Sequence, residues 1–309
     1  MKKLFLLFAF FSLTSYAQDK NFSLVEVKIN ELLTGNLYSP ENSKKPNLVI
    51  IIAGSGPTDR DGNQNAMKNN SLKFLAEAIA KNGNAAFSFD KRIFSQMKSG
   101  TLKESDLSFE DLINDTKDII KYFKSQKKYN KIIIAGHSEG SLIGMIAANE
   151  NADAYISLSG PGRSADLIII DQLSKQAPAL TQEVTADFEI LKKGETFELK
   201  NQMLASIFRQ SIQPYIISWI KYNPQEEIKK LKIPVLIVNG TKDLQVSVSE
   251  AELLKKAKPE ATLKIIANMN HVLKEIKTDD AENMKSYNTP DLPVTNELIT
   301  DVNDFIKKI

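Results

Sequence analysis

The chain has 309 residues, of which 42% are hydrophobic, with no cysteine and only two histidines. This length is enough for one large domain with a full core, and the lack of cysteine excludes disulfides and thiolate metal sites. The 40 basic and 38 acidic residues nearly cancel, which argues against a nucleic-acid partner.

The first 17 residues have the pattern of a secretory signal peptide. Lys2 and Lys3 precede an apolar run, residues 4–13, that is too short to span a bilayer. Small side chains at Ser15 and Ala17 predict cleavage after Ala17. We therefore expect the protein to be exported, periplasmic or secreted. No cysteine follows the run, so we expect no lipid or other stable membrane anchor.

Strand-like and helix-like segments alternate along most of the chain. Residues 24–30 and 32–40 predict a hairpin, whereas the first of the later strands, 47–54, is continuously apolar, as a strand buried on both faces is. These later strands are expected at 47–54, 84–90, 131–136, 153–160, 233–240 and 261–269. Helices are expected at 71–83, capped by Ser71, and at 108–126, 141–149, 247–258 and 296–309. This order predicts an α/β fold with a mostly parallel sheet and helices on both faces.

The alternation stops between residues 163 and 230. This stretch has helical periods at 164–176 and 202–212 but no convincing strand, and it is too long for a loop. We therefore expect a helical cap inserted into a core formed by residues 18–162 and 231–309. Ligands bind at the carboxyl ends of parallel strands, so the cap is expected to cover that end of the sheet.

Residues 136–140, GHSEG, match the pattern G-x-S-x-G between an apolar strand and a helix. A sharp turn of this kind projects the hydroxyl of Ser138 from the sheet, at the cost of a strained backbone. Gly136 and Gly140 let strand and helix approach closely, and the helix directs its amide groups at the same position. Ser138 is the predicted nucleophile.

A serine nucleophile needs a base, and the chain offers His137 and His271. Successive side chains in such a turn point apart, so His137 is expected to pack or hydrogen-bond beside it. His271 lies in the loop after the last predicted strand, from which it can reach the ligand crevice. His271 is therefore the predicted base.

Asp243, just past strand 233–240, is the predicted acid that orients the base. The chain order Ser138, Asp243, His271 is typical of hydrolases with this turn. The rival acid is Asp90, at the end of strand 84–90. Because it precedes the serine in the chain, we expect it instead to form an ion pair with Lys91 or Arg92.

The oxyanion of an acyl-transfer reaction needs two amide donors. One is expected to be the amide of Glu139, directly after the nucleophile, and the other that of Ser55 in the glycine-rich loop AGSGPTDRDGN. Gly54 and Gly56 leave the backbone around Ser55 accessible.

The same loop resembles three other kinds of binding loop only superficially. It lacks the third glycine of a dinucleotide loop and the Gly-Lys pair of a P-loop. Asp59, Asp61 and Asn63 resemble the start of a calcium loop, but the glycine stands at the fourth position instead of the sixth, and the twelfth residue is Asn70 instead of glutamate. We expect no cofactor and no metal, and we expect Asp59, Arg60 and Asp61 to form a charged network that shapes the loop.

Together these segments resemble the α/β-hydrolase superfamily, in particular a branch of bacterial esterases. The matching pieces between residues 48 and 275 are GSGPTDRDGN, SFDKR, GHSEG, KIPVLIVNGTKDLQV and MNHVLKE. The resemblance implies a Ser138–Asp243–His271 triad, carboxylic esters of short or medium acyl chains as substrates, and no cofactor. Two departures are Ala53-Gly54, where relatives often have His-Gly, and DKRIFSQ, where relatives often continue with Gly-x-Gly.

These features predict a serine esterase that cleaves a small-molecule ester through an acyl-enzyme intermediate. Phe208, Tyr215, Trp219 and Tyr222 are candidates either for the lining of the acyl pocket or for the core of the cap. Two alternatives stay open. One is a serine peptidase acting near a peptide terminus, although the cap sequence reveals no charged anchor, and the other is a non-catalytic periplasmic binding protein of the same fold.

Overall fold

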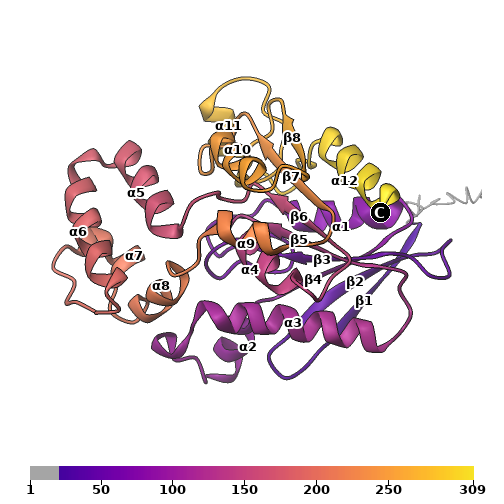
Figure 1. Ribbon diagram of the computed structural model, residues 1–309, viewed down its shortest axis with the longest axis horizontal. Coiled ribbons are helices and arrows are strands. Elements are labelled where there is room, and N and C mark those ends of the chain that lie inside the picture. Colours follow the sequence, from indigo (N-terminus) through magenta and orange to yellow (C-terminus); the bar gives the residue numbers. More distant parts are fainter. Residues whose placement is uncertain (1–20) are drawn as a thin grey trace, which may run out of the picture.

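The computed structural model describes residues 21–309, so the predicted signal peptide at residues 1–17 lies outside the described residues. An eight-stranded sheet forms the centre of the molecule, and helices cover both of its faces (Figure 1). The strands are β1 (Phe22–Lys28), β2 (Thr34–Pro40), β3 (Leu48–Ile52), β4 (Ala85–Phe89), β5 (Ile132–His137), β6 (Ala154–Leu158), β7 (Val235–Gly240) and β8 (Thr262–Ile266).

The strands follow one another across the sheet in the order β1-β2-β4-β3-β5-β6-β7-β8. The hairpin β1–β2 and the pair β2–β4 are antiparallel, and all later pairs are parallel. The predicted fold class, a mostly parallel sheet with an antiparallel edge and helices on both faces, is confirmed.

The helices of the described residues are more numerous than the sequence pattern predicts. They are α1 (Ser71–Lys81), α2 (Arg92–Ser99), α3 (Phe109–Ser125), α4 (Glu139–Ala148), α5 (Ala165–Gln176), α6 (Thr181–Lys192), α7 (Ala205–Phe208), α8 (Gln213–Trp219), α9 (Pro224–Lys230), α10 (Val248–Ala257), α11 (Asp280–Ser286) and α12 (Asn296–Lys308). Short 3₁₀ turns lie at Glu104–Asp106, Pro178–Leu180 and Gln202–Leu204.

Side chains of the central strands alternate between two apolar layers. In β3, Leu48, Ile50 and Ile52 face the layer built by α3, α4, α9 and α10, whereas Val49 and Ile51 face α1 and α12. Successive side chains of a strand point to opposite faces, so this continuously apolar strand is buried on both sides. The two layers fix the sheet and hold the carboxyl ends of its strands in place.

The residue at the N-terminal capping position of helix α1 differs by one from the predicted residue. Ser71 is the first residue of the helix, and the capping position is Asn70, whose φ is 53° and whose side chain makes no capping hydrogen bond. Ser71 instead donates its amide to the Asn69 side chain at 3.0 Å. The prediction of Ser71 as the cap is therefore wrong, although the helix itself is present.

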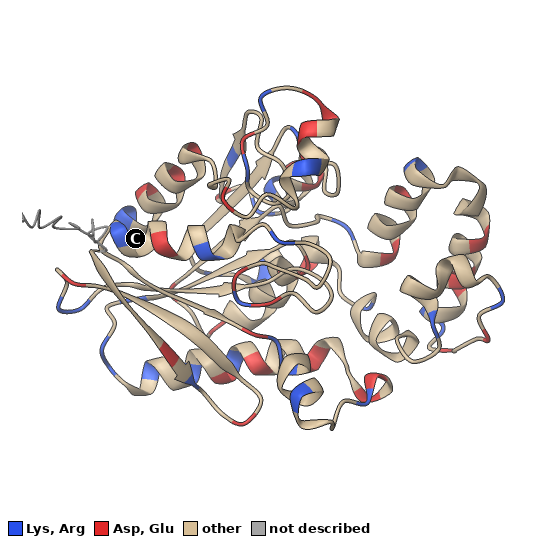
Figure 2. Cartoon of the chain, turned by 180° about the vertical axis from the view of Figure 1, so that it is seen from behind, with Lys and Arg blue, Asp and Glu red and all other residues tan. Residues whose placement is uncertain are grey.

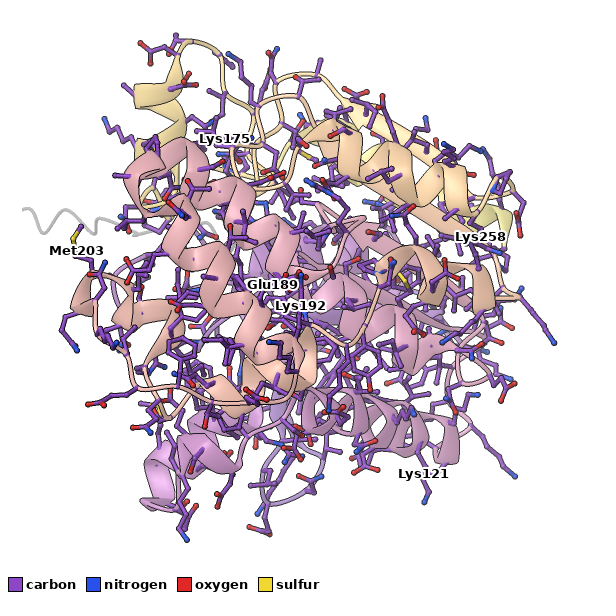
Figure 3. All side chains as sticks on the ribbon, turned by 60° about the vertical axis from the view of Figure 1, so that its left-hand side comes forward. Lys121, Lys175, Glu189, Lys192, Met203 and Lys258 are labelled. Atoms are coloured by element: carbon purple, nitrogen blue, oxygen red, sulfur yellow. The ribbon has the colours of Figure 1, made fainter. Side chains whose placement is uncertain are left out.

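Helices α5 to α8 pack around an apolar cluster of their own and lie at one end of the sheet, on the left in Figure 1. The cluster contains Val184, Phe188, Leu191, Leu204, Phe208 and Ile216. Lys192 of α6 joins that helix to α5 through an ion pair of 2.7 Å with the buried Asp166. Figure 3 shows Lys192 beside Glu189 of the same helix. Helix α9 packs on α4 and α10 instead, where Ile228 joins the apolar layer that contains α3, α4 and α10.

The surface carries charges of both signs in close mixture. Figure 2, which views the molecule from behind relative to Figure 1, shows Lys and Arg interspersed with Asp and Glu over the helices. Within residues 21–309, no helix combines the length and the apolar character needed to cross a bilayer.

Candidate active site

The chain turns sharply from β5 into α4 at Ser138. Its backbone angles are φ 54° and ψ −122°, a region that is strained for any residue with a side chain. The neighbouring glycines allow the turn, since a Cβ at Gly136 would lie 2.1 Å from the carbonyl oxygen of Gly140. A Cβ at Gly140 would lie 2.6 Å from the carbonyl oxygens of Ile52 and Ala53. The turn exposes the Ser138 side chain to a pocket at the carboxyl end of the sheet.

The structure brings His271 and Asp243 together from the loops after β8 and β7. His271 Nδ1 lies 2.9 Å from Asp243 Oδ2, and the exposed fractions of the two side chains are 5% and 0%. Asp243 Oδ1 also accepts the amides of Gln245 and Val246, at 2.9 and 2.8 Å. Burial opposes ionisation of Asp243, but the adjacent His271 and these hydrogen bonds outweigh it and lower the pKa of the carboxyl below 3.8. Asp243 is therefore an anion at neutral pH.

Ser138 and His271 share a small recess of about 50 Å³, which Gly54, Ser55 and His137 also line. Within the described part of the chain, no hydrogen bond joins Ser138 Oγ to His271 Nε2. Such bonds often tighten only when substrate is in place. The recess thus brings the predicted base, His271, close to the predicted nucleophile, Ser138.

His137 holds the backbone of the residue that is predicted to act as the base. Its Nε2 lies 2.7 Å from the carbonyl oxygen of His271, and because a carbonyl only accepts, this nitrogen must carry the proton. Burial, followed by the nearby imidazole of His271, lowers the pKa of His137 to about 4. His137 is therefore neutral at pH 7 and serves as a buried hydrogen-bond donor.

We expect the neutral state of His137 to make the protein sensitive to mild acid. The unfolded chain binds this proton with the ordinary pKa of 6.5, whereas the folded chain binds it only near 4. Below pH 6.5 the unfolded state therefore holds more protons, and the free energy of unfolding falls by up to about 3 kcal/mol as the pH drops to 4.

The measurement is urea unfolding of the wild type and of His137→Gln at pH 7 and pH 4.5. Glutamine keeps an N–H donor for the His271 carbonyl but has no proton to bind, so the variant should lose less stability in acid. Equal losses in both proteins would contradict the role given to His137.

Ser55 and Glu139, the predicted sources of the oxyanion donors, both line the larger pocket together with Ser138. The carboxylate of Glu139 is buried and has two partners that sequence reasoning missed. It forms an ion pair of 2.7 Å with Lys91 and accepts a hydrogen bond of 2.6 Å from the Tyr215 hydroxyl. The only sequence signal was the charged segment SFDKR, which contains Lys91.

The expected partners of Asp90 are wrong. Asp90 binds Arg60 through both carboxylate oxygens, with contacts of 2.8 to 3.0 Å. Lys91 points inward to Glu139, and Arg92 pairs with Asp111 and Asp115. The side chains of neighbouring residues after a strand point in different directions, so adjacency in the sequence did not predict which side chains form ion pairs. Asp90 is not among the residues that line the recess of Ser138 and His271.

The loop after β3 is shaped by the charged side chains of Asp59 and Arg60, as predicted, whereas the prediction for Asp61 is wrong, because its buried Oδ1 has no hydrogen-bond partner among the described residues. Asp59 Oδ1 accepts the amides of Asp61 and Asn63 at 2.9 and 2.8 Å, which closes the turn on itself. Arg60 ties the same loop to Asp90 and also to Glu26 at 2.8 Å. The loop that contains Ser55 is therefore anchored to the sheet edge.

A pocket of about 460 Å³ opens above Ser138 between the sheet and helices α5 to α8. Much of its wall is aliphatic and includes Ile93, Leu107, Leu112, Ile168, Ile169, Ile207, Ile212 and Ile216. Of the four aromatic candidates, Tyr215 and Trp219 line this pocket. Phe208 lies inside the apolar cluster of helices α5 to α8. Tyr222 packs against Phe109, and its hydroxyl donates to Glu110.

The ionic side chains in the pocket wall have partners of opposite charge. Arg209 binds Glu104, and Arg92 binds Asp111 and Asp115. Within residues 21–309, no group of three or more His, Asp or Glu side chains could hold a metal ion. The pocket therefore presents a mainly neutral, apolar surface to a ligand.

Comparison with known proteins gives the same fold and a family. Esterase EstD from Thermotoga maritima is 25% identical over 282 residues, which are 89% of this chain and 66% of that protein, so the chain spans just under two thirds of its length. Est1E from Butyrivibrio proteoclasticus superposes with a TM-score of 0.59 at 19% identity, over 93% of this chain and 99% of that one. The Pyrococcus furiosus esterase Pf2001 gives 0.56 at 17% identity, over 93% and 91%.

The structural neighbours are too distant in sequence to show more than the shared α/β-hydrolase fold. The sequence model of the BD-FAE family, however, matches residues 36–257, from β2 through α10, and so includes both Ser138 and Asp243. This match covers well over half of the chain, and the protein belongs to the BD-FAE family.

Proposed function

We propose that the protein is a serine esterase that hydrolyses carboxylic esters with short or medium acyl chains. The observation that carries this proposal is the buried His271–Asp243 pair, 2.9 Å apart, whose imidazole lines the same recess as the strained Ser138. Similarity to Esterase EstD and membership of the BD-FAE family support the reaction class.

In the first step Ser138 Oγ attacks the ester carbonyl carbon while His271 Nε2 accepts the hydroxyl proton. The imidazolium that forms is stabilised by Asp243, which accepts the Nδ1–H hydrogen bond and fixes the tautomer. The carbonyl oxygen becomes an anion and accepts hydrogen bonds from the amides of Ser55 and Glu139. The carbon–oxygen bond to the leaving alcohol then breaks, and that oxygen takes the proton from His271.

The second step releases the acid from the acyl-enzyme. Water attacks the acyl carbon while His271 accepts one of its protons, and the same two amides stabilise the second tetrahedral anion. When this intermediate collapses, Ser138 Oγ leaves and receives the proton. The free enzyme is regenerated without a cofactor.

The aliphatic wall of the pocket above Ser138 favours an ester substrate whose acyl group carries no charge. Each methylene that the pocket buries adds about 0.8 kcal/mol, which is about a fourfold gain in kcat/KM. The gain should stop when the chain exceeds the pocket of about 460 Å³. This pattern predicts a maximum at intermediate chain length.

The test is a series of p-nitrophenyl esters from acetate to laurate, measured with the purified protein. We expect kcat/KM to rise over the first members and then fall, and we expect a fluorophosphonate probe to label Ser138. Faster cleavage of aminoacyl anilides than of every ester would favour the peptidase. A protein that neither turns over these substrates nor reacts with the probe would favour the binding protein.

A further inference from the structure

A buried ion pair lies directly behind the predicted oxyanion site and has no part in the mechanism above. Lys91 Nζ is 2.7 Å from Glu139 Oε2, and the exposed fractions of the two side chains are 5% and 2%. Removing two charges from water is costly and often adds no stability compared with apolar side chains. A pair in this position therefore suggests a functional role.

The Lys91 ammonium also binds the backbone of the loop that contains Ser55. It donates to the carbonyl oxygen of Gly54 at 2.5 Å and to that of Gly56 at 3.3 Å. Together with Glu139, these contacts use all three N–H groups of the ammonium. The lysine is thus held in one orientation between the loop and helix α4.

The Gly54 contact determines the direction of the Ser55 amide. Peptide bonds among the described residues are all trans, so the Gly54 carbonyl and the Ser55 N–H point in opposite directions within one plane. When Lys91 holds the carbonyl oxygen on its own side, the Ser55 N–H is turned to the opposite side. The positive charge of the Lys91 ammonium beside the carbonyl oxygen also polarises the peptide and strengthens its N–H as a donor.

We propose that Lys91 is a positioning residue of the oxyanion hole, which fixes and polarises the Gly54–Ser55 peptide and is itself held by Glu139. This inference rests on the proposed esterase function. Lys91 acts through the Ser55 amide and does not touch the reacting atoms.

Tyr215 connects this arrangement to the cap. Its hydroxyl, on helix α8, donates to Glu139 Oε1 at 2.6 Å, while Oε2 of the same carboxylate binds Lys91. Burial and the charge of Glu139 raise the pKa of Tyr215 well above 10, so the hydroxyl keeps its proton as a donor. Because Tyr215 also lines the acyl pocket, it links the position of the cap to that of the oxyanion donors.

The principal test replaces the charged pair. Lys91→Met leaves the buried Glu139 without its cation and can impair folding, so we add the double variant Lys91→Met/Glu139→Gln, which buries no unpaired charge. Both should lower kcat by about 10- to 100-fold with KM changed less than about threefold, somewhat less than complete removal of an oxyanion donor. Inhibition by phenylboronic acid, whose tetrahedral adduct places an oxygen in the same site, should weaken in parallel.

Lys192→Met is the matched control, because it also removes a lysine from a buried carboxylate, Asp166, but this lysine makes no hydrogen bond to the Gly54 carbonyl. It should change stability and leave kcat and boronate inhibition near wild type. A folded double variant with wild-type kcat and boronate affinity would overturn the proposal while leaving the esterase assignment intact. Absence of turnover and of probe labelling in the wild type would instead refute the proposed function.

A second pair of variants tests the link without altering a charge. Tyr215→Phe removes only the hydroxyl and should lower kcat by about fivefold or more, since Glu139 loses a hydrogen bond that helps to hold its carboxylate against Lys91. Tyr222→Phe removes a similar cap hydroxyl, 3.2 Å from Glu110, and should leave kcat unchanged. Equal kcat values for the two variants would overturn the proposed link between the cap and the oxyanion hole.

Discussion

Replacement of Ser138 by alanine should lower kcat for p-nitrophenyl esters by about 10⁴- to 10⁶-fold, because alanine has no hydroxyl at the turn to form the acyl-enzyme. Labelling by a fluorophosphonate should disappear as well. His271, Asp243 and the pocket remain, so KM should stay within a few-fold of the wild type where residual turnover can be measured. A variant that keeps more than a tenth of the activity would contradict the assignment.

The stability of Ser138 variants gives an independent readout of the strained turn. Alanine must adopt the same positive φ of 54° as serine, so Ser138→Ala should unfold at nearly the wild-type urea concentration. Glycine adopts this conformation without strain, and Ser138→Gly should be more stable than the alanine variant by about 1 kcal/mol.

Ser141 provides the matched control on the same helix. Its hydroxyl is buried and hydrogen-bonded to Tyr155 and Ser157, each at 2.8 Å, and it does not line the recess. Ser141→Ala should therefore lower the free energy of unfolding by about 1 to 3 kcal/mol. It should still react with the probe, and loss of labelling in this variant alone would move the nucleophile away from Ser138.

The sequence predicts the sheet and the positions of the candidate triad because the apolar runs are unambiguous. Strands such as β3 and β5 are buried on both faces, and their predicted ends at Gly54 and Gly136 lie within two residues of the observed ends at Ile52 and His137. With only two histidines available, the loop after β8 was the one place from which a base could reach Ser138. Scarcity of the residue type made that prediction possible.

The contacts behind the site could not be predicted because they depend on packing between distant segments. Glu139 was used only for its amide, since nothing in the local sequence places its carboxylate against Lys91, 48 positions away, or against Tyr215 in the cap. Arg60 and Asp90 meet across 30 positions for the same reason. Helix α6 was missed because its apolar residues are few, and Val184, Phe188 and Leu191 acquire their meaning only in the core of the cap.

Asp243→Asn should lower kcat by about 10⁴-fold at neutral pH with little change in stability. The asparagine carbonyl can still accept the amides of Gln245 and Val246, so the loop should keep its shape. Its NH₂ group would then face His271 Nδ1 and donate to it. This forces the proton of the neutral imidazole onto Nε2, and that nitrogen can no longer accept the proton of Ser138. Steady-state kinetics together with urea unfolding measures both effects.

Asp90→Asn distinguishes the two carboxylates that the sequence offers for this role. It removes Oδ2, the oxygen that accepts both Nε and Nη2 of Arg60, and should lower the free energy of unfolding, because Arg60 has an exposed fraction of only 15% and loses its main anion. Since Asp90 binds Arg60 and has no hydrogen bond to His271, kcat should fall less than about tenfold, through a looser loop around Ser55. A greater loss of kcat in Asp90→Asn than in Asp243→Asn would reverse the assignment of the acid. The difference between the two variants isolates the tautomer of His271, because both remove one negative charge that binds a partner and only one of the two carboxylates touches the imidazole.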